Sequence, residues 1–194
     1  MKVHDLTLPV NDAQVEIMEI GDTVYLTGTI YTARDMAHLE IKKLVNENAA
    51  LPVELSGRAV FHAGPVVRKT DSGWELIVVG PTTSIRMEPH AQMVGKLGVK
   101  MIIGKGGMST GSKAAFREYK QVYLQAAPGC AVQLANGVKR VANVHWLENG
   151  MPEAMWELEV EKFGPLFVTM DTKENSRYDT LKKTAADKIN EIYG

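Results

Sequence analysis

The stretch VYLTGTIYTARDMAH, residues 24–38, runs from an apolar segment of β-strand type through a turn rich in Gly and Thr to a cationic residue. Two further stretches repeat this order, ELIVVGPTTSIRME at residues 75–88 and VKMIIGKGGM at residues 99–108. Loops that follow neighbouring strands meet at one sheet edge, where free backbone N–H groups can bind anions. The cations that these strands would deliver are Arg34, Arg86 and Lys105. Together they predict an anion pocket, and two or three fixed cations suit a small dicarboxylate better than a lone carboxylate.

Each cation also has a simpler structural interpretation. Arg34 could be a solvated residue near a helix start, although a cation there opposes the helix dipole unless an anion is bound. Arg86 could be a surface residue near Glu88. It follows Thr82 by about one helical turn, so both could instead face one site. Lys105 could lie in an ordinary turn, or its flanking glycines could let the backbone approach a ligand closely.

The composition is that of one globular domain spanning residues 1–194. Lys plus Arg (22) nearly balances Asp plus Glu (23), so no global field favours nucleic acid or an anionic membrane. No apolar run approaches the roughly 20 residues that cross a bilayer. The N-terminus MKVHDLTLPVND has no apolar signal-peptide segment, so we expect a cytoplasmic protein without membrane or nucleic-acid partners.

The single cysteine, Cys130, excludes a disulfide framework and any thiolate cluster built by this chain alone. Its small and apolar neighbours favour a small buried side chain over a nucleophile. The five histidines show no metal-ligand spacing, so no metal site is expected. His38 lies one helical turn after Arg34, where a structural role, such as orienting Asp35, is favoured over substrate contact.

The order of strand and helix signals predicts an α/β or α+β fold. Thr32 is expected to cap a helix that runs to about Asn48, with Asp35 three residues on. The continuous apolar run at 75–79 is typical of a strand covered on both faces. The other expected strands are 4–10, 13–21, 23–30, 58–61, 66–67, 99–103, 121–126, 138–146, 155–163 and 163–171. The other expected helices are 84–95, capped within Thr82–Ser84, then 111–117, 131–136 and an amphipathic helix at 179–193.

The series TGTIYTARDMAH, FHAGP, VGPTTSIRME, GKGGM and MPEAMWELEVEKFGPLFVTMD occurs in this order along the chain. In order and spacing it resembles the β subunit of two-subunit class I fumarases and L-tartrate dehydratases, which are iron–sulfur hydro-lyases. The resemblance covers about residues 5–178. It implies an α/β fold, a swivelling β/β/α domain of three layers that closes over a catalytic α subunit. In that family the α subunit supplies the three cysteines of a 4Fe–4S cluster, which agrees with the single cysteine here.

The same resemblance implies roles for individual residues. Arg34 and Arg86 would bind the substrate carboxylates, and Lys105 would be a further cation at the site. Thr82 would be the general base at carbon, with Thr83 as a rival for that role and otherwise a substrate-binding residue. A threonine base requires nearby cations that lower the pKa of its hydroxyl.

The resemblance implies a β subunit that is inactive alone and that, in a hetero-oligomer with its α subunit, hydrates fumarate reversibly to (S)-malate. Three alternatives stay open: an L-tartrate dehydratase β subunit, the swivelling domain of another dehydratase, and a non-catalytic domain that binds small carboxylates. Two segments depart from the family pattern. Phe61-His62 stand where Tyr is frequent, and TKENSRY (172–178) replaces a Gly-Asn-Ser segment. We expect neither departure to touch the four residues proposed for the site.

Overall fold

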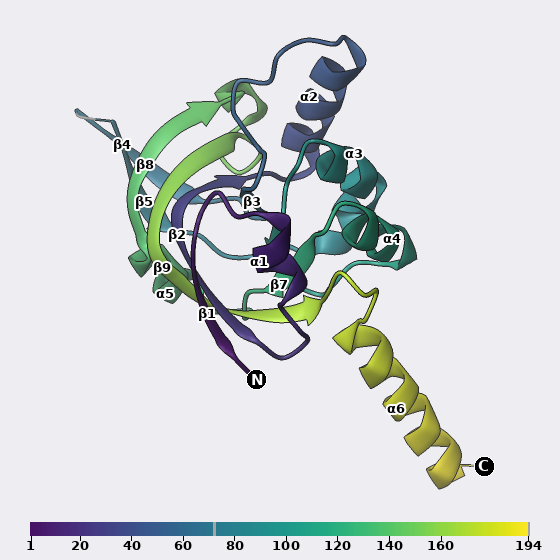
Figure 1. The fold of residues 1–194 in the computed structure, drawn as a ribbon. Coiled ribbons are helices and arrows are strands. Elements are labelled where there is room, and N and C mark those ends of the chain that lie inside the picture. The colour runs from purple at the N-terminus through teal and green to yellow at the C-terminus, as the bar shows by residue number, and fades with distance from the viewer. Residues whose placement is uncertain (72, 194) are drawn as a thin grey trace.

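Parallel strands form the centre of the computed structural model, which describes residues 1–71 and 73–193 (Figure 1). Five strands pair in parallel in the order β1 (Val3–Thr7), β2 (Thr23–Thr32), β3 (Ala59–Phe61), β6 (Met101–Gly104) and β7 (Val122–Gln125). The long strand β9 (Met155–Met170) runs antiparallel and pairs with both β7 and β2. These pairings close β2, β3, β6, β7 and β9 into a ring, and β8 (Val138–His145) pairs with β9 outside it.

The two faces of the parallel strands carry separate hydrophobic clusters. Phe61, Ile103 and Leu124 belong to the cluster inside the ring, which includes Trp156 of β9. Their neighbours Val60, Ile102 and Tyr123 belong to the second cluster, which lies under the helices. This alternation follows from the two-residue period of a strand. The helices that cover this face are α2 (Asp35–Asn46), the 3-10 helix η1 (Ser84–His90), α3 (Ala91–Lys96) and α4 (Thr110–Glu118).

The opposite side is formed by β8, the first half of β9 and a two-stranded hairpin of β4 (Val66–Thr70) and β5 (Gly73–Val78) (Figure 1). The predicted α/β class is confirmed, and the arrangement of helices, parallel strands and outer strands agrees with three layers. The remaining short elements are α1 (Asp12–Glu16), α5 (Ala131–Asn136) and the 3-10 helix η2 (Leu147–Asn149). Whether the domain swivels stays a prediction.

Strand β5 is not covered on both faces, so that prediction was wrong. Its residues alternate between exposed and partly buried because the hairpin packs only one face on the body. On that face Trp74 meets Trp156 edge to face at 5.2 Å between ring centroids, whereas Ile77 is exposed. The buried strand predicted at 99–103 is confirmed, since every residue of β6 is buried.

The strand expected at 13–21 is also wrong, because α1 occupies its first part. A reciprocal capping box starts this helix. The Asn11 side chain accepts a hydrogen bond from the Gln14 backbone at 3.0 Å, and the Gln14 side chain accepts one from the Asn11 backbone at 3.1 Å. Val15 and Met18 are fully buried, a three-residue spacing that fits a helix turn rather than a strand.

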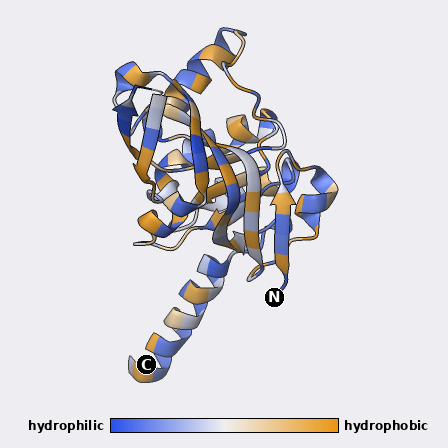
Figure 2. Cartoon of the chain, turned by 90° about the vertical axis from the view of Figure 1, so that its left-hand side faces the viewer, coloured by the Kyte–Doolittle hydropathy of each residue, from blue (hydrophilic) through white to orange (hydrophobic). Residues whose placement is uncertain are grey.

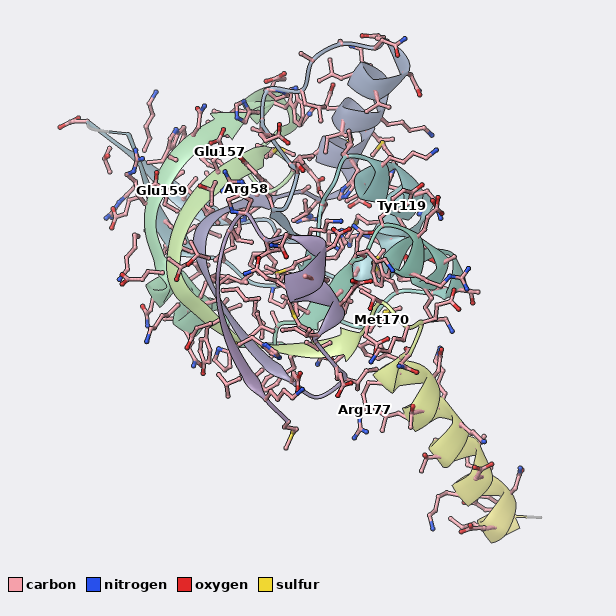
Figure 3. All side chains as sticks on the ribbon, in the orientation of Figure 1. Arg58, Tyr119, Glu157, Glu159, Met170 and Arg177 are labelled. Carbon is pink, nitrogen blue, oxygen red and sulfur yellow. The ribbon has the colours of Figure 1, made fainter. Side chains whose placement is uncertain are left out.

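The predicted segments 155–163 and 163–171 form one strand, β9. Its alternation is as expected, with Trp156, Leu158 and Val160 buried and the intervening glutamates at least partly exposed. Glu157 and Glu159 are labelled in Figure 3. The alternating colours of Figure 2 show the same two-faced pattern along the curved strands.

The last helix, α6 (Arg177–Tyr193), begins two residues before its predicted start and projects away from the rest of the chain (Figures 1 and 2). Within residues 1–71 and 73–193, no helix combines the length and apolar character needed to cross a membrane.

Candidate active site

Three strand ends meet at the carboxyl edge of the parallel sheet. Arg34 follows β2, His62 follows β3 and Lys105 follows β6, and these strands are adjacent and parallel. The ladder continues beyond the strands, because the Ala33 backbone donates to the Phe61 carbonyl at 2.9 Å and the His62 backbone donates to the Ile103 carbonyl at 2.8 Å. The loops that carry these residues are therefore held in register by main-chain bonds.

The Thr82–Ser84 segment is bound between two of these loops. Its first residue donates from the Thr82 backbone to the His62 carbonyl at 2.7 Å, and the Thr82 carbonyl accepts from the Lys105 backbone at 3.2 Å. The Ser84 backbone in turn donates to the Lys105 carbonyl at 3.1 Å. Thr82, Thr83 and Lys105 thus lie side by side. The Thr82 hydroxyl forms no hydrogen bond within the described parts of the chain, so it is available to a ligand.

Arg86 is joined to the start of α2 by a forked ion pair. Its Nη2 lies 2.8 Å from Asp35 Oδ2 and its Nε lies 3.3 Å from Asp35 Oδ1. Burial alone would raise the pKa of Asp35, but the hydrogen bonds and charge of Arg86 outweigh this and lower it. Glu88 is not the neighbour that holds Arg86, because its carboxylate accepts from the Ser109 and Ser112 backbones at the start of α4.

Arg34 is the N-cap of α2, where its side chain makes no capping bond. Glu153, from the loop before β9, caps the N-terminus of α2 instead. Its Oε2 accepts from the Met36 backbone at 3.1 Å, and its Oε1 lies 3.0 Å from Arg34 Nη2. The Arg34 Nε–H is buried and has no partner among the described residues. The unpaired buried donor costs stability, and the partly exposed remainder of the Arg34 side chain is the part that a ligand can reach.

The prediction that Thr32 caps this helix was wrong. Thr32 is buried in β2, where its Oγ1 accepts from the Trp156 backbone at 3.0 Å and donates to the Ala154 carbonyl at 3.4 Å. The hydroxyl therefore ties β2 to β9, and α2 runs from Asp35 to Asn46, not to Asn48.

Buried polar side chains hold the loops that carry the cations in place. His38 donates from Nδ1 to the Arg34 carbonyl at 2.7 Å, and burial lowers the pKa of His38 to about 4. Its ring packs edge to face on His62, whose Nδ1 lies 2.9 Å from Ser84 Oγ. Tyr123 donates to the same Ser84 oxygen at 2.8 Å. Burial lowers the pKa of His62 well below its ordinary value and raises that of Tyr123, so these groups are neutral near pH 7.

The structural role favoured for His38 is therefore confirmed, although its partner is the Arg34 carbonyl and not Asp35. Sequence reasoning assigned no site role to Asp35, Glu153, His62 or Tyr123. Asp35 and His62 lie inside the quoted stretches TARD and FHAGP, so their positions carried a signal. Glu153 lies inside the quoted stretch MPEAMWELEVEKFGPLFVTMD, so its position carried a signal as well. Nothing local marks Tyr123, which lies on β7.

The glycines around Lys105 serve packing more than ligand approach. A Cβ at Gly104 would collide with Ser84 Oγ, and one at Gly107 would collide with the Tyr178 ring. Only Gly106, with φ +81°, has open space, because a Cβ added there would lie 3.8 Å from its nearest neighbouring atom. One of the two departures from the family pattern touches a proposed site residue, contrary to expectation, and the other lies beside the Lys105 loop without touching the four residues. His62 binds Thr82, and Tyr178 packs beside the Lys105 loop.

The resulting site is open. Arg34, Thr82 and Lys105 are partly exposed, and Thr83 and Arg86 are exposed. Such an arrangement of three cations and two hydroxyls can bind the two carboxylates of a small diacid and leaves room for a second protein to cover them.

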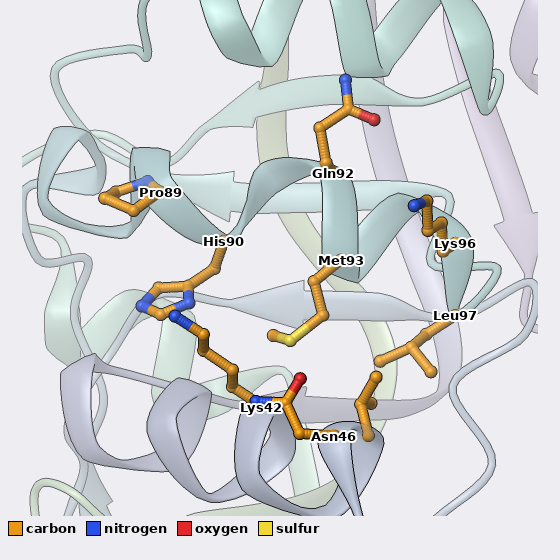
Figure 4. A pocket seen from close by; sticks show the side chains of 9 residues that line it. Lys42, Asn46, Pro89, His90, Gln92, Met93, Lys96 and Leu97 are labelled. Atoms are coloured by element: carbon orange, nitrogen blue, oxygen red, sulfur yellow. The ribbon is translucent and has the colours of Figure 1, made fainter. Parts of the chain in front are cut away.

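A separate groove of about 290 Å³ lies between α2 and α3 and is lined by Lys42, His90, Met93 and Lys96, among others (Figure 4). It contains none of the predicted site residues.

The described residues contain no group of three or more His, Cys, Asp or Glu side chains able to hold a metal ion. Cys130 lies at the N-cap of α5, where its Sγ donates to the Ala127 carbonyl at 2.7 Å. The thiol is partly buried and packs against the cluster inside the ring, so the expected small buried side chain is found only in part.

Comparison with known proteins gives the family. Residues 1–181 match the family described as Fumarase C-terminus. The chain is 47% identical over 182 residues to "Putative L(+)-tartrate dehydratase subunit beta" of Methanocaldococcus jannaschii, covering 93% of each chain. It is 40% identical over 188 residues to the L(+)-tartrate dehydratase subunit beta of Escherichia coli K12, covering 96% of this chain and 92% of the relative. It is 39% identical over 193 residues to "Putative fumarate hydratase class I" of Geobacillus stearothermophilus, covering 98% of this chain but 36% of the relative. The chain therefore belongs to the Fumarase C-terminus family, a family of tartrate dehydratase-like and fumarase-like hydro-lyases.

Proposed function

We propose that this chain is the β subunit of an iron–sulfur hydro-lyase that reversibly hydrates fumarate to (S)-malate in the cytoplasm. The single observation that carries the proposal is the contact chain at the carboxyl edge of the sheet. Arg34 adjoins Asp35, Asp35 binds Arg86, and the segment before Arg86 is bonded to Lys105. In a member of this family, three cations held together by these contacts are suited to bind both carboxylates of a four-carbon diacid.

The reaction explains why cations are needed. Dehydration of malate removes a proton from the carbon that lies α to one carboxylate and β to the hydroxyl, the hydroxyl departs, and a C=C bond forms. Negative charge accumulates on that carboxylate in the transition state, where fixed cations stabilise it without reorganisation. Arg34 and Arg86 would hold the two carboxylates, with Lys105 as a further positive charge.

Thr82 is the proposed base that takes the carbon-bound proton, and Thr83 is the rival. A hydroxyl can do so only if its pKa is lowered by neighbouring positive charge. The bond between the Lys105 backbone and the Thr82 carbonyl supports the proposal, because it keeps the threonine next to the lysine.

The 4Fe–4S cluster of the proposal does not fit this chain, which has one cysteine, and that cysteine lies at α5. We therefore assign the cluster ligands to a partner α subunit in a hetero-oligomer, in line with the "subunit beta" names of two relatives. When bound there, the cluster supplies a Lewis acid for the departing hydroxyl. This chain would contribute the carboxylate clamp and the base, and would be inactive alone.

Anaerobic co-production with the α subunit tests the proposal. The purified complex should contain iron and sulfide and convert (S)-malate to fumarate, whereas the isolated chain should contain no stoichiometric iron and show no turnover. A cluster or turnover in the isolated chain would contradict the division of roles. A complex that binds malate without any turnover would indicate a non-catalytic carboxylate-binding domain instead.

L(+)-Tartrate dehydration is the second candidate, favoured by the names of the relatives from M. jannaschii and E. coli. Tartrate differs from malate by one hydroxyl, which the same clamp would accommodate. The ratio of kcat/KM for tartrate to that for malate, measured on the assembled complex, decides between the two.

A further inference from the structure

Helix α6 is a 17-residue arm that contacts the body through its first turn and has no further partner in the described structure. None of its residues is buried, and Figure 3 shows its side chains projecting into the surroundings from Arg177 onward. Most of the stability of protein helices comes from packing of an amphipathic face, so a helix of this kind ordinarily packs on a surface.

One face of α6 carries an apolar stripe. Tyr178, Leu181, Ala185, Ile189 and Ile192 follow the spacing i, i+3, i+7, i+11 and i+14, which places them on one side of a helix. The three large aliphatic side chains of the stripe are exposed to solvent, at 51% for Leu181, 56% for Ile189 and 69% for Ile192. The stripe is therefore an exposed apolar surface of the kind that proteins normally bury.

The residues beside the stripe are cationic. By helical geometry, Lys182 borders it on one side, and Arg177 and Lys188 border it on the other. Lys188 is paired with Glu191 at 3.1 Å, so Lys182 and Arg177 carry the uncompensated positive charge. Two copies of α6 packed stripe to stripe would bring these like charges together along one seam, which is unfavourable. The charge pattern therefore favours an apolar groove with acidic rims on a different protein over a second copy of this chain.

The root of α6 lies beside the candidate active site. The Tyr178 ring packs against Gly107, two residues after Lys105, and its hydroxyl donates to Gln125 at 2.7 Å. Lys113 of α4 pairs with Asp179 at 2.8 Å and fixes the first turn. A protein that covers the open site from the Lys105 loop would thus meet α6 as it leaves the body.

We propose that α6 is the docking arm for the cluster-bearing α subunit, with its stripe seated in an apolar, acid-rimmed groove of that subunit. This inference rests on the proposed function, because it takes the partner to be the subunit that completes the site. The arm would fix the partner next to the Lys105 loop while the cations remain free for substrate.

The test compares two neighbouring substitutions in the same helix turn. Ile189→Glu places a carboxylate on the stripe, and Asn190→Glu adds the same side chain and the same charge about 100° away around the helix. Both sites are exposed, so the thermal midpoint of the isolated chain should not change for either variant. The Kd for the purified α subunit is measured for each variant by a surface-based binding assay.

We expect Ile189→Glu to weaken binding by about 10- to 100-fold, the range of a lost apolar anchor, and Asn190→Glu to change it by less than about threefold. Raising the α subunit to saturation should restore the wild-type kcat of Ile189→Glu, because the site itself is intact. Equal affinity of both variants would overturn the inference. So would an isolated chain that dimerises through α6, if Ile189→Glu made it monomeric without changing the Kd for the α subunit. If the wild-type complex forms but turns over neither malate nor tartrate, the proposed function fails while the affinity comparison still decides on the arm.

Discussion

Replacing Arg86 by Ala should damage the site in two separable ways. The substrate carboxylate that Arg86 is proposed to bind would lose a charge-assisted hydrogen bond, which costs about 1.5–3 kcal/mol. In addition, Asp35 loses the cation that lies 2.8 Å from its Oδ2 and then faces the substrate carboxylate as an uncompensated charge. Because the side chains of Arg86 and Asp35 are 42% and 43% exposed, solvent screens this repulsion to about 1 kcal/mol. The sum predicts a loss of roughly 50- to 1,000-fold in kcat/KM, with KM raised.

The second contribution can be isolated by a double-mutant cycle. In the Arg86→Ala background, Asp35→Asn should recover about fivefold of kcat/KM, because it removes the repulsion. In the wild-type background, Asp35→Asn should change kcat/KM by less than about threefold, because Arg86 keeps its charge.

Steady-state kinetics on the assembled enzyme measures both effects. Arg68→Ala is the matched control, since Arg68 forks onto Glu75 in the β4–β5 hairpin in the same manner and should leave kcat/KM unchanged. An unchanged KM in Arg86→Ala, or a double variant as impaired as the sum of the single losses, would refute this reasoning.

Three further perturbations have defined outcomes. Thr82→Ala should lower kcat of the complex by about 10²–10⁴-fold with KM nearly constant, and Thr82→Ser should retain much more activity because it keeps the hydroxyl; a collapse in Thr83→Ala alone would move the base by one residue. Thr32→Val should lower the free energy of unfolding by about 1–3 kcal/mol in urea titrations, because the backbone N–H of Trp156 loses its buried acceptor. Thr32→Ser keeps the hydroxyl and should cost less. His38 has a pKa of about 4 in the folded chain against 6.5 for the free side chain, so the unfolded state binds its proton first as the pH falls. The stability that depends on neutral His38 is complete above about pH 6.5, and His38 should account for roughly 2 kcal/mol of the loss between pH 7 and pH 5. Buried His62 adds to that loss, and unfolding titrations of His38→Gln should lack only the His38 part.

Local patterns predicted the elements that bring cations to the site. The buried strand before Lys105 follows from an uninterrupted apolar run. The Gly- and Thr-rich segment before Arg34 was wrongly predicted to be a turn, because residues 27–32 lie within β2. The strand expected at residues 13–21 failed for a local reason as well, since the capping box of Asn11 and Gln14 outweighed a short alternation. These features depend on neighbours within a few residues, so one sequence was enough to predict most of them.

By itself the sequence determined the residue types of the site, the order of its loops and the inability of this chain to supply a three-cysteine cluster. The tertiary structure alone decided that Asp35 binds Arg86, that Glu153 caps the helix begun by Arg34, and that the Thr32 hydroxyl binds β9 instead of capping α2. The Glu153 and Thr32 contacts exist because β9 pairs with β2. The Asp35–Arg86 pair exists because main-chain bonds hold the segment before Arg86 against His62 and Lys105. Strand closure joins residues that are distant along the chain, and no local propensity encodes which distant partner a side chain meets.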